Sequence, residues 1–251
     1  MDYLVSIERT AYFHWQIELL IESFRHHNLQ DSLVIAIADG DDPFECYLPN
    51  FYQHERKFLH ANNLACKNAN KFHAISAALQ NKLIQQPFVL IHPDMILMKP
   101  LDFVSSANIL FHDENYPPIP EIAPHIQEIA KLKGVEELPW LSVGGVMRFQ
   151  DVPVEFFDQA LQNCLKLKIE FPEHHFVERA AWILTIYEWL GALTCEANVF
   201  EITLMNHDVE SNFIHYKYGI PPMFNKHMFR FDGSISTGTD PYDVLLQNND
   251  S

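Results

Sequence analysis

The sequence predicts an α/β protein with a mostly parallel central sheet flanked by helices. Strand-like and helix-like segments alternate through the first half of the chain, an order that favours parallel strands joined by helical crossovers. The run Phe88–Ile91 is wholly apolar, as expected for a strand that is covered on both faces. With 48% apolar residues in a length of 251, the chain is able to bury a sizeable core.

The first half begins with a strand–helix–strand unit. Tyr3–Ile7 is predicted to be a strand, Tyr12–His26 carries apolar residues at helical spacing, and Leu33–Ala38 is predicted to be a second strand. After a polar and aromatic connection, apolar residues at helical spacing predict a helix over Asn70–Gln85, which leads into the strand at Phe88.

The second half is less regular. Its predicted elements are a strand at Ile109–Phe111, a helix at His125–Lys133 after a proline-rich loop, a strand interrupted by two glycines over 141–149, and helices at Pro153–Lys168 and His174–Leu190. Trp182 and Trp189 share one face of the last helix and are expected in the core. Neither a repeat nor a linker is evident, so we expect a single domain over residues 1–240 and a flexible tail over 241–251.

Charge and cysteine usage narrow the functional classes. A net charge of −16 argues against a general affinity for nucleic acid or for anionic membranes. The four cysteines are widely spaced and lack paired CxxC motifs, which predicts free thiols in a reducing compartment. The chain begins with a predicted strand rather than a basic, apolar leader, and it contains no apolar run of about twenty residues. We therefore expect a cytoplasmic protein without a membrane span.

The clearest candidate site follows the apolar strand at Phe88. Ligands of open α/β sheets bind outside the carboxyl ends of the strands, where His92 and Asp94 are expected to lie. A divalent cation such as Mn²⁺ or Mg²⁺ takes carboxylate oxygens as ligands, which Asp94 supplies. Imidazole suits these ions less well, so His92 is either a further ligand or a hydrogen-bonding partner of a phosphate or ribose oxygen. The structural alternative is a turn that ends the strand, with an Asx cap.

A second histidine strengthens the metal interpretation. His215 follows an apolar pair and precedes aromatic residues and Lys217. This pattern suits a histidine that returns to the metal beside a lysine that meets phosphate. A lone histidine is usually not a ligand, and the pairing with the His92 motif is what favours His215 among the 14 histidines of the chain.

These motifs together resemble the landmarks of GT-A glycosyltransferases, which use a DxD-type metal motif. The matching segments, in chain order, are Asn70-Lys71-Phe72, His92-Pro93-Asp94, Gly144-Gly145 and His215-Tyr216. Within that superfamily the order most resembles the hydroxyproline arabinosyltransferase and peptidyl serine galactosyltransferase group. The resemblance spans residues 3–219 and implies a GT-A-like, Rossmann-related fold.

The resemblance also implies roles for single residues. Asp94 and His215 would hold the metal, and His92 would occupy the position of the first DxD aspartate, a departure that bears on metal affinity and activity. The residues expected at the nucleotide, the donor sugar or the acceptor are Ser6, Asp39, Asn70, Lys71, His92, Gly144, Gly145 and Lys217. Asp39 has the alternative role of capping a turn.

Glu178 is the candidate catalytic residue. It resembles the acid that the family places on a helix facing the cleft, where it would bond donor or acceptor hydroxyls or act as a base. An acid beside Arg179 on an amphipathic helix is more often part of a solvated face with local ion pairs, and that alternative stays open.

The function expected from these residues is transfer of a sugar from a nucleotide-sugar donor, predicted to be a UDP-sugar, to a hydroxyl-bearing acceptor with the help of Mn²⁺ or Mg²⁺. One alternative is a catalytically silent GT-A-like protein that binds nucleotide or glycan, which the presence of His92 in place of an acid favours. Another is a metal-dependent nucleotidyltransferase or hydrolase that uses the same cleft.

Overall fold

The computed structural model describes residues 1–8, 11–39, 57–62, 66–102, 105–113, 119–200, 202–204, 211–215, 219–220 and 224–225. Its centre is a seven-stranded sheet with the strand order β3-β2-β1-β4-β7-β6-β8. The strands are β1 (Asp2–Glu8), β2 (Leu33–Asp39), β3 (Lys57–Asn62), β4 (Phe88–Ile91), β6 (Ile109–Phe111), β7 (Val146–Phe149) and β8 (Cys195–Ala197). The first four are parallel to one another, and β7 is antiparallel to both of its neighbours. The expected α/β class with a mostly parallel sheet is confirmed.

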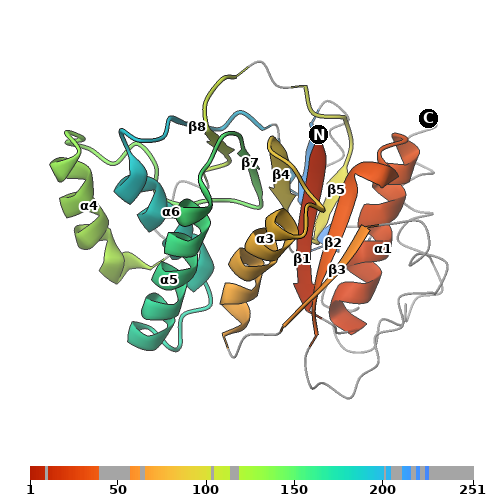
Figure 1. Cartoon of the computed structure of the whole chain (residues 1–251), viewed down its shortest axis with the longest axis horizontal. Helices are drawn as coiled ribbons and strands as arrows, with labels where there is room; N and C mark the ends of the chain where they lie inside the picture. The colour runs from red at the N-terminus through yellow and green to blue at the C-terminus, as the bar shows by residue number, and fades with distance from the viewer. Residues whose placement is uncertain are drawn as a thin grey trace.

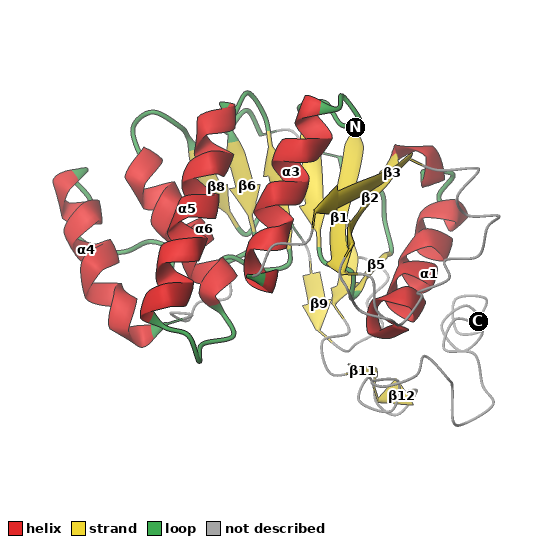
Figure 2. Cartoon of the chain, turned by 60° about the horizontal axis from the view of Figure 1, so that its bottom comes forward, coloured by secondary structure: helices red, strands yellow, loops and turns green. Residues whose placement is uncertain are grey.

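Helices cover both faces of this sheet. α1 (Ala11–His26) packs on one face, where its buried Ile17 and Leu20 share a core with Tyr3 and Val5 of β1. The intervening Leu4 of β1 faces the second core, beneath the other helices. Those helices are α3 (Asn70–Gln80), α5 (Val154–Glu170) and α6 (Val177–Trp189), with α4 (Ala123–Leu132) packed outside α6 (Figure 1 and Figure 2).

Short elements complete the described part. The 3-10 helices are η1 (Gln30–Ser32), η2 (Lys67–Ala69) and η3 (Pro120–Ile122). A three-stranded sheet has the order β5-β10-β9, formed by β5 (Met95–Leu97), β10 (Phe213–His215) and β9 (Ile202–Leu204). β11 (Gly219–Ile220) pairs with β12 (Phe224–Asn225). No helix in the described part of the chain is long and apolar enough to cross a membrane.

The largest differences from the predicted bounds occur in two elements. The helix expected to reach Gln85 ends at Gln80, and two residues later Lys82 has a positive φ of 55°, which no helix continues through. The strand expected over 141–149 begins at Val146, so both glycines precede it rather than interrupt it. The amides of Leu141 and Ser142 donate to the carboxylate of Asp113 instead of to a neighbouring strand.

Candidate functional site

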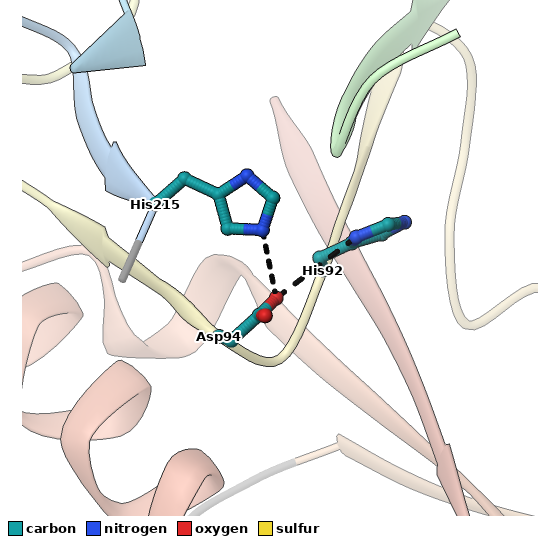
Figure 3. Close-up of side chains that lie close together, drawn as sticks. All are labelled: His92, Asp94 and His215. Atoms are coloured by element: carbon teal, nitrogen blue, oxygen red, sulfur yellow. Dashed lines mark ion pairs between the residues drawn. The ribbon is translucent and has the colours of Figure 1, made fainter. Parts of the chain in front are cut away.

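Three side chains that can bind a metal meet beyond the carboxyl end of β4. His215 Nε2 lies 3.3 Å from Asp94 Oδ1, and His92 Nδ1 lies 3.9 Å from the same oxygen. The ligand atoms of the three residues all lie within 4.8 Å of one another. Figure 3 shows the ring of His215 directed toward the carboxylate, and the nearer ring nitrogen of His92 on the side of Asp94, from different segments of the chain.

Backbone pairing brings these segments together. β4 ends at Ile91, and the amide of His92 donates to the carbonyl of Gly145 at 2.9 Å, which fixes the backbone where the strand ends. The chain then turns into β5, and β10 pairs antiparallel with β5 so that His215 lies opposite Met95. A histidine far along the sequence therefore lies beside Asp94 because two short strands share one register.

The chemistry of the three side chains fits a divalent cation. They provide one carboxylate oxygen and two imidazole nitrogens, a mixed set that suits first-row transition ions such as Mn²⁺ better than Mg²⁺, which prefers oxygen ligands alone. His215 is 3% exposed, and the side chain of Asp94 is 13% exposed. A carboxylate with so little solvent is stabilised by a nearby positive charge, which a cation would supply.

Lys71 links this group to Glu178. Its Nζ lies 2.7 Å from His92 Nε2 and 2.5 Å from Glu178 Oε1. The side chains of Lys71 and Glu178 are 11% and 18% exposed, so this ion pair is shielded from water more than a surface pair would be. Lys71 lies at the start of α3 and Glu178 at the start of α6, and the pair therefore joins two helices at the edge of the site.

The electrostatics around His92 favour the neutral ring. Burial lowers its pKa well below the usual 6.5, and the positive charge of Lys71 lowers it further, while Asp94 acts in the opposite direction. The imidazole is therefore neutral at pH 7, and a neutral ring has one nitrogen that donates a hydrogen bond and one that accepts.

A cavity of about 320 Å³ adjoins these residues. Six of the predicted site residues line it: Ser6, Asn70, Lys71, His92, Asp94 and Glu178. They come from β1, α3, the turn between β4 and β5, and α6, so four separate segments of the chain contribute to one cleft.

Sequence reasoning missed other polar residues of the cavity. Gln16 of α1 is 1% exposed and lines the cavity, as do Glu8 and Lys67, whose carboxylate and ammonium groups lie 3.1 Å apart. Gln16 had a detectable signal, since it is a polar residue on the apolar face of a helix, between Phe13 and Leu20. Lys67 had none, because it precedes α3 in a segment without a regular pattern.

Four predicted residues are not placed at the cavity by the described part of the structure. Gly144 and Gly145 are not among the residues that line the cavity. A Cβ on Gly145 would collide with Met95 Cε and lie 3.2 Å from His92 Nδ1, so the absent side chain makes room chiefly for Met95 and also for His92. Asp39 ends β2, but its side chain lies outside the described residues, as does Lys217.

Asp113 binds the loop that precedes Gly144 and Gly145. It is 2% exposed, and its Oδ1 accepts hydrogen bonds from the amides of Leu141 and Ser142 at 3.3 and 2.9 Å. Because Gly145 accepts from the amide of His92, the Asp113 carboxylate helps to position the backbone on which His92 depends.

Comparison with solved structures relates this fold to glycosyltransferases. The structure titled "WbbM bifunctional glycosytransferase apo structure" matches with a TM-score of 0.56 and 10% identity over 99% of this chain and 49% of the other. This chain thus spans about half the length of that one. The galactosyltransferase LgtC, solved with donor and acceptor sugar analogs, matches with a TM-score of 0.46 and 10% identity over 86% of this chain and 87% of the other.

The chain has a GT-A-like fold. No family model and no curated protein sequence matches it. The likeness to WbbM, at 10% identity, shows the fold alone and does not extend to the narrower resemblance to the hydroxyproline arabinosyltransferase and peptidyl serine galactosyltransferase group.

Proposed function

We propose that this protein transfers a sugar from a nucleotide-sugar donor, specifically a UDP-sugar, to a hydroxyl-bearing acceptor with the help of a divalent cation. The observation that carries the proposal is the meeting of His92, Asp94 and His215 beside a cavity at the carboxyl end of β4. This is the edge of an open α/β sheet where ligands bind, and the GT-A-like fold supports the assignment.

Asp94 and His215 would hold the cation, with His92 beside them. When bound, the ion would compensate the negative charge of the leaving diphosphate as the glycosidic bond breaks. The imidazole of His215 favours Mn²⁺ over Mg²⁺. A cation is needed in this chain because its net charge of −16 opposes the approach of an anionic nucleotide.

The cavity offers groups for the rest of the donor. Lys71 and Lys67 border it and provide positive charge for phosphate oxygens, while Ser6 and Asn70 provide neutral hydrogen-bonding groups for ribose or base. Asp39 and Lys217 remain proposed contacts of the nucleotide, and Gly144 and Gly145 remain proposed neighbours of the transferred sugar.

Glu178 is proposed to bond hydroxyls of the donor or acceptor, or to act as the base. It lines the cavity, but its Oε1 already accepts from Lys71 at 2.5 Å. Its second oxygen is thus the one proposed to meet a substrate hydroxyl, with Lys71 fixing the orientation of the carboxylate.

The test is ligand-dependent thermal stability followed by product analysis. A ligand that binds the native state raises the unfolding free energy by about 2.7 kcal/mol at 100 times its dissociation constant. UDP and UDP-sugars should raise the melting temperature with Mn²⁺ and fail to do so with excess chelator. Transfer is then measured as the release of UDP and the appearance of a glycosylated hydroxyl acceptor. An equal shift with and without chelator would contradict the role of the cation.

One observation favours a silent binding protein as the second candidate. His92 replaces an acid and is already bonded to Lys71, so the site has one carboxylate where the related motif has two. Such a protein would show the Mn²⁺-dependent shift with UDP but release no UDP from any donor. Turnover therefore separates the two candidates.

A further inference from the structure

The contact between Lys71 and His92 has a consequence for which nitrogen of the ring carries the proton. We infer that Lys71 holds His92 in the tautomer that is protonated on Nδ1, so that His92 donates a hydrogen bond into the cleft and does not ligate the cation. The inference deepens the proposed function, because it leaves Asp94 and His215 as the protein ligands of the proposed metal site.

The first step concerns donors and acceptors. A lysine ammonium has three donors and no acceptor, and its Nζ lies 2.7 Å from His92 Nε2. Nε2 must therefore accept, and it cannot carry a hydrogen of its own. A neutral imidazole with an accepting Nε2 is protonated on Nδ1, and a doubly protonated ring is excluded by the same contact.

The second step concerns the direction of Nδ1. This nitrogen is the one that lies 3.9 Å from Asp94 Oδ1, on the side of the ring where the three ligand atoms gather. A nitrogen that carries a hydrogen has no free lone pair for a metal. His92 therefore presents a hydrogen-bond donor to the cleft, where a carboxylate or substrate oxygen would accept, and it offers no nitrogen lone pair to a metal ion.

The third step concerns how firmly Lys71 is held. Glu178 Oε1 accepts from the same ammonium at 2.5 Å, and both side chains are largely buried. Moving the proton of His92 to Nε2 would place it against the ammonium, so Lys71 would have to leave His92 and strain its bond to Glu178. Leaving a buried charged group without its partner is costly. Glu178 is thus a positioning residue for Lys71, whatever else it does with substrate.

Nitrogen NMR of the protein with ¹⁵N-labelled histidine tests the tautomer directly, without metal or nucleotide. The His92 signals are assigned by their loss in His92→Gln. We expect a protonated Nδ1 and an unprotonated Nε2 in the unaltered protein at pH 7. In Lys71→Met the preference should be lost, whereas Lys67→Met, which removes a lysine of the same cavity that pairs with Glu8, should leave it intact. A protonated Nε2 in the unaltered protein would overturn the inference.

Titration with Mn²⁺ supplies a second readout. His92→Gln should change Mn²⁺ affinity by less than about twofold in the unaltered background. Lys71→Met should tighten Mn²⁺ binding, because it frees His92 to act as a ligand and removes a positive charge near the ion. In the double variant with Lys71→Met and His92→Gln, the part of the gain that is due to His92 as a ligand should vanish. The part that remains is due to the removed charge. A loss of tenfold or more from His92→Gln alone would show that His92 is a ligand and would overturn the inference. Absence of Mn²⁺ binding in every variant would instead refute the proposed metal site, while the NMR result would still decide the tautomer.

Discussion

The two halves of the central sheet serve different purposes. The parallel strands β1 and β4 end at the cavity, which is lined by Ser6 and Glu8 of β1 and by His92 and Asp94 after β4. The mixed half, formed by β7, β6 and β8, is covered by aromatic packing in which Phe149 lies against Phe88 and Trp182 at 5.2 and 5.6 Å between ring centroids. Parallel strands bring several polar side chains to one edge, whereas the mixed half is stabilised by packed aromatic rings.

The helix α6 joins the two halves. Glu178 in its first turn faces the cavity, and Trp182 is buried against Phe72 of α3 with ring centroids 4.5 Å apart. These two residues are four positions apart in the sequence, so their side chains lie on the same side of the helix, about one turn apart. Aromatic packing of α6 therefore sets where Glu178 and its partner Lys71 lie.

The largest effect is expected in the mixed half. Trp182 is 1% exposed, and Trp182→Ala removes a large ring and leaves a cavity. We expect the unfolding free energy to fall by about 3–5 kcal/mol, measured by urea denaturation. Trp189→Ala is the matched control, because that ring is only partly buried against the same core and should cost less. Equal losses would show that α6 is not anchored mainly through Trp182.

A substitution at the site in the parallel half should change Mn²⁺ affinity more than it changes the unfolding free energy. Asp94→Asn keeps the volume of the side chain but removes the charge and one metal-binding oxygen. Altering an outer partner of a metal ligand typically costs about 10–100-fold in affinity, so losing a ligand itself should cost at least as much in a Mn²⁺ titration. The unfolding free energy without metal should change by less than about 1 kcal/mol. A stability loss as large as that of Trp182→Ala would erase the distinction between the two halves.

The contrast between the halves also explains what the sequence could predict. The apolar run at Phe88 and the helical spacing in α1 follow from local periodicity, and both elements are present. His92 and Asp94 could be predicted as site residues because they directly follow a parallel strand, and ligands bind at the carboxyl ends of such strands. Each of these features depends on a short stretch of chain, and so each can be predicted from one sequence.

Contacts between distant segments could not be predicted in the same way. The bonds of Lys71 to Glu178 and His92 depend on how α3 and α6 pack, and no local pattern of charges indicates that partnership. The expected place of the glycines beside the donor sugar or acceptor stays a prediction, and no local pattern indicated that Gly145 lies close to His92 and Met95. His215 was predicted from its local pattern together with the His92 motif, but the register that places it beside Asp94 depends on the β5–β10 pair.

A smaller effect is expected where the two halves meet. Gly145→Ala places a methyl group against Met95 and the ring of His92, which is overpacking and should cost about 1–3 kcal/mol in unfolding free energy. Gly144→Ala is the matched control, because its methyl group would meet His112 instead, with Cδ2 at 2.8 Å and the carbonyl oxygen at 3.1 Å. Both variants should lose stability, but only Gly145→Ala should shift the NMR signals of His92. A His92 shift of equal size in both variants would show that the glycine segment moves as one unit.

The smallest effect is the pH dependence that His92 contributes to stability. Its pKa is depressed in the native protein, mainly by burial, and returns toward 6.5 on unfolding. Below pH 6.5 the unfolded chain therefore binds a proton that the native state excludes, so stability falls as the pH drops and is unaffected above that range. The slope reaches at most about 1.4 kcal/mol per pH unit. His92→Gln removes this contribution. The partly buried His27, whose pKa is also lowered, is present in both proteins, so its contribution cancels in the comparison. Urea denaturation at pH 5, 6 and 7 should thus show the unaltered protein losing stability relative to His92→Gln as the pH falls. Parallel curves for the two proteins would mean that the native site accepts the proton readily, contrary to a neutral His92 held between Lys71 and the cleft.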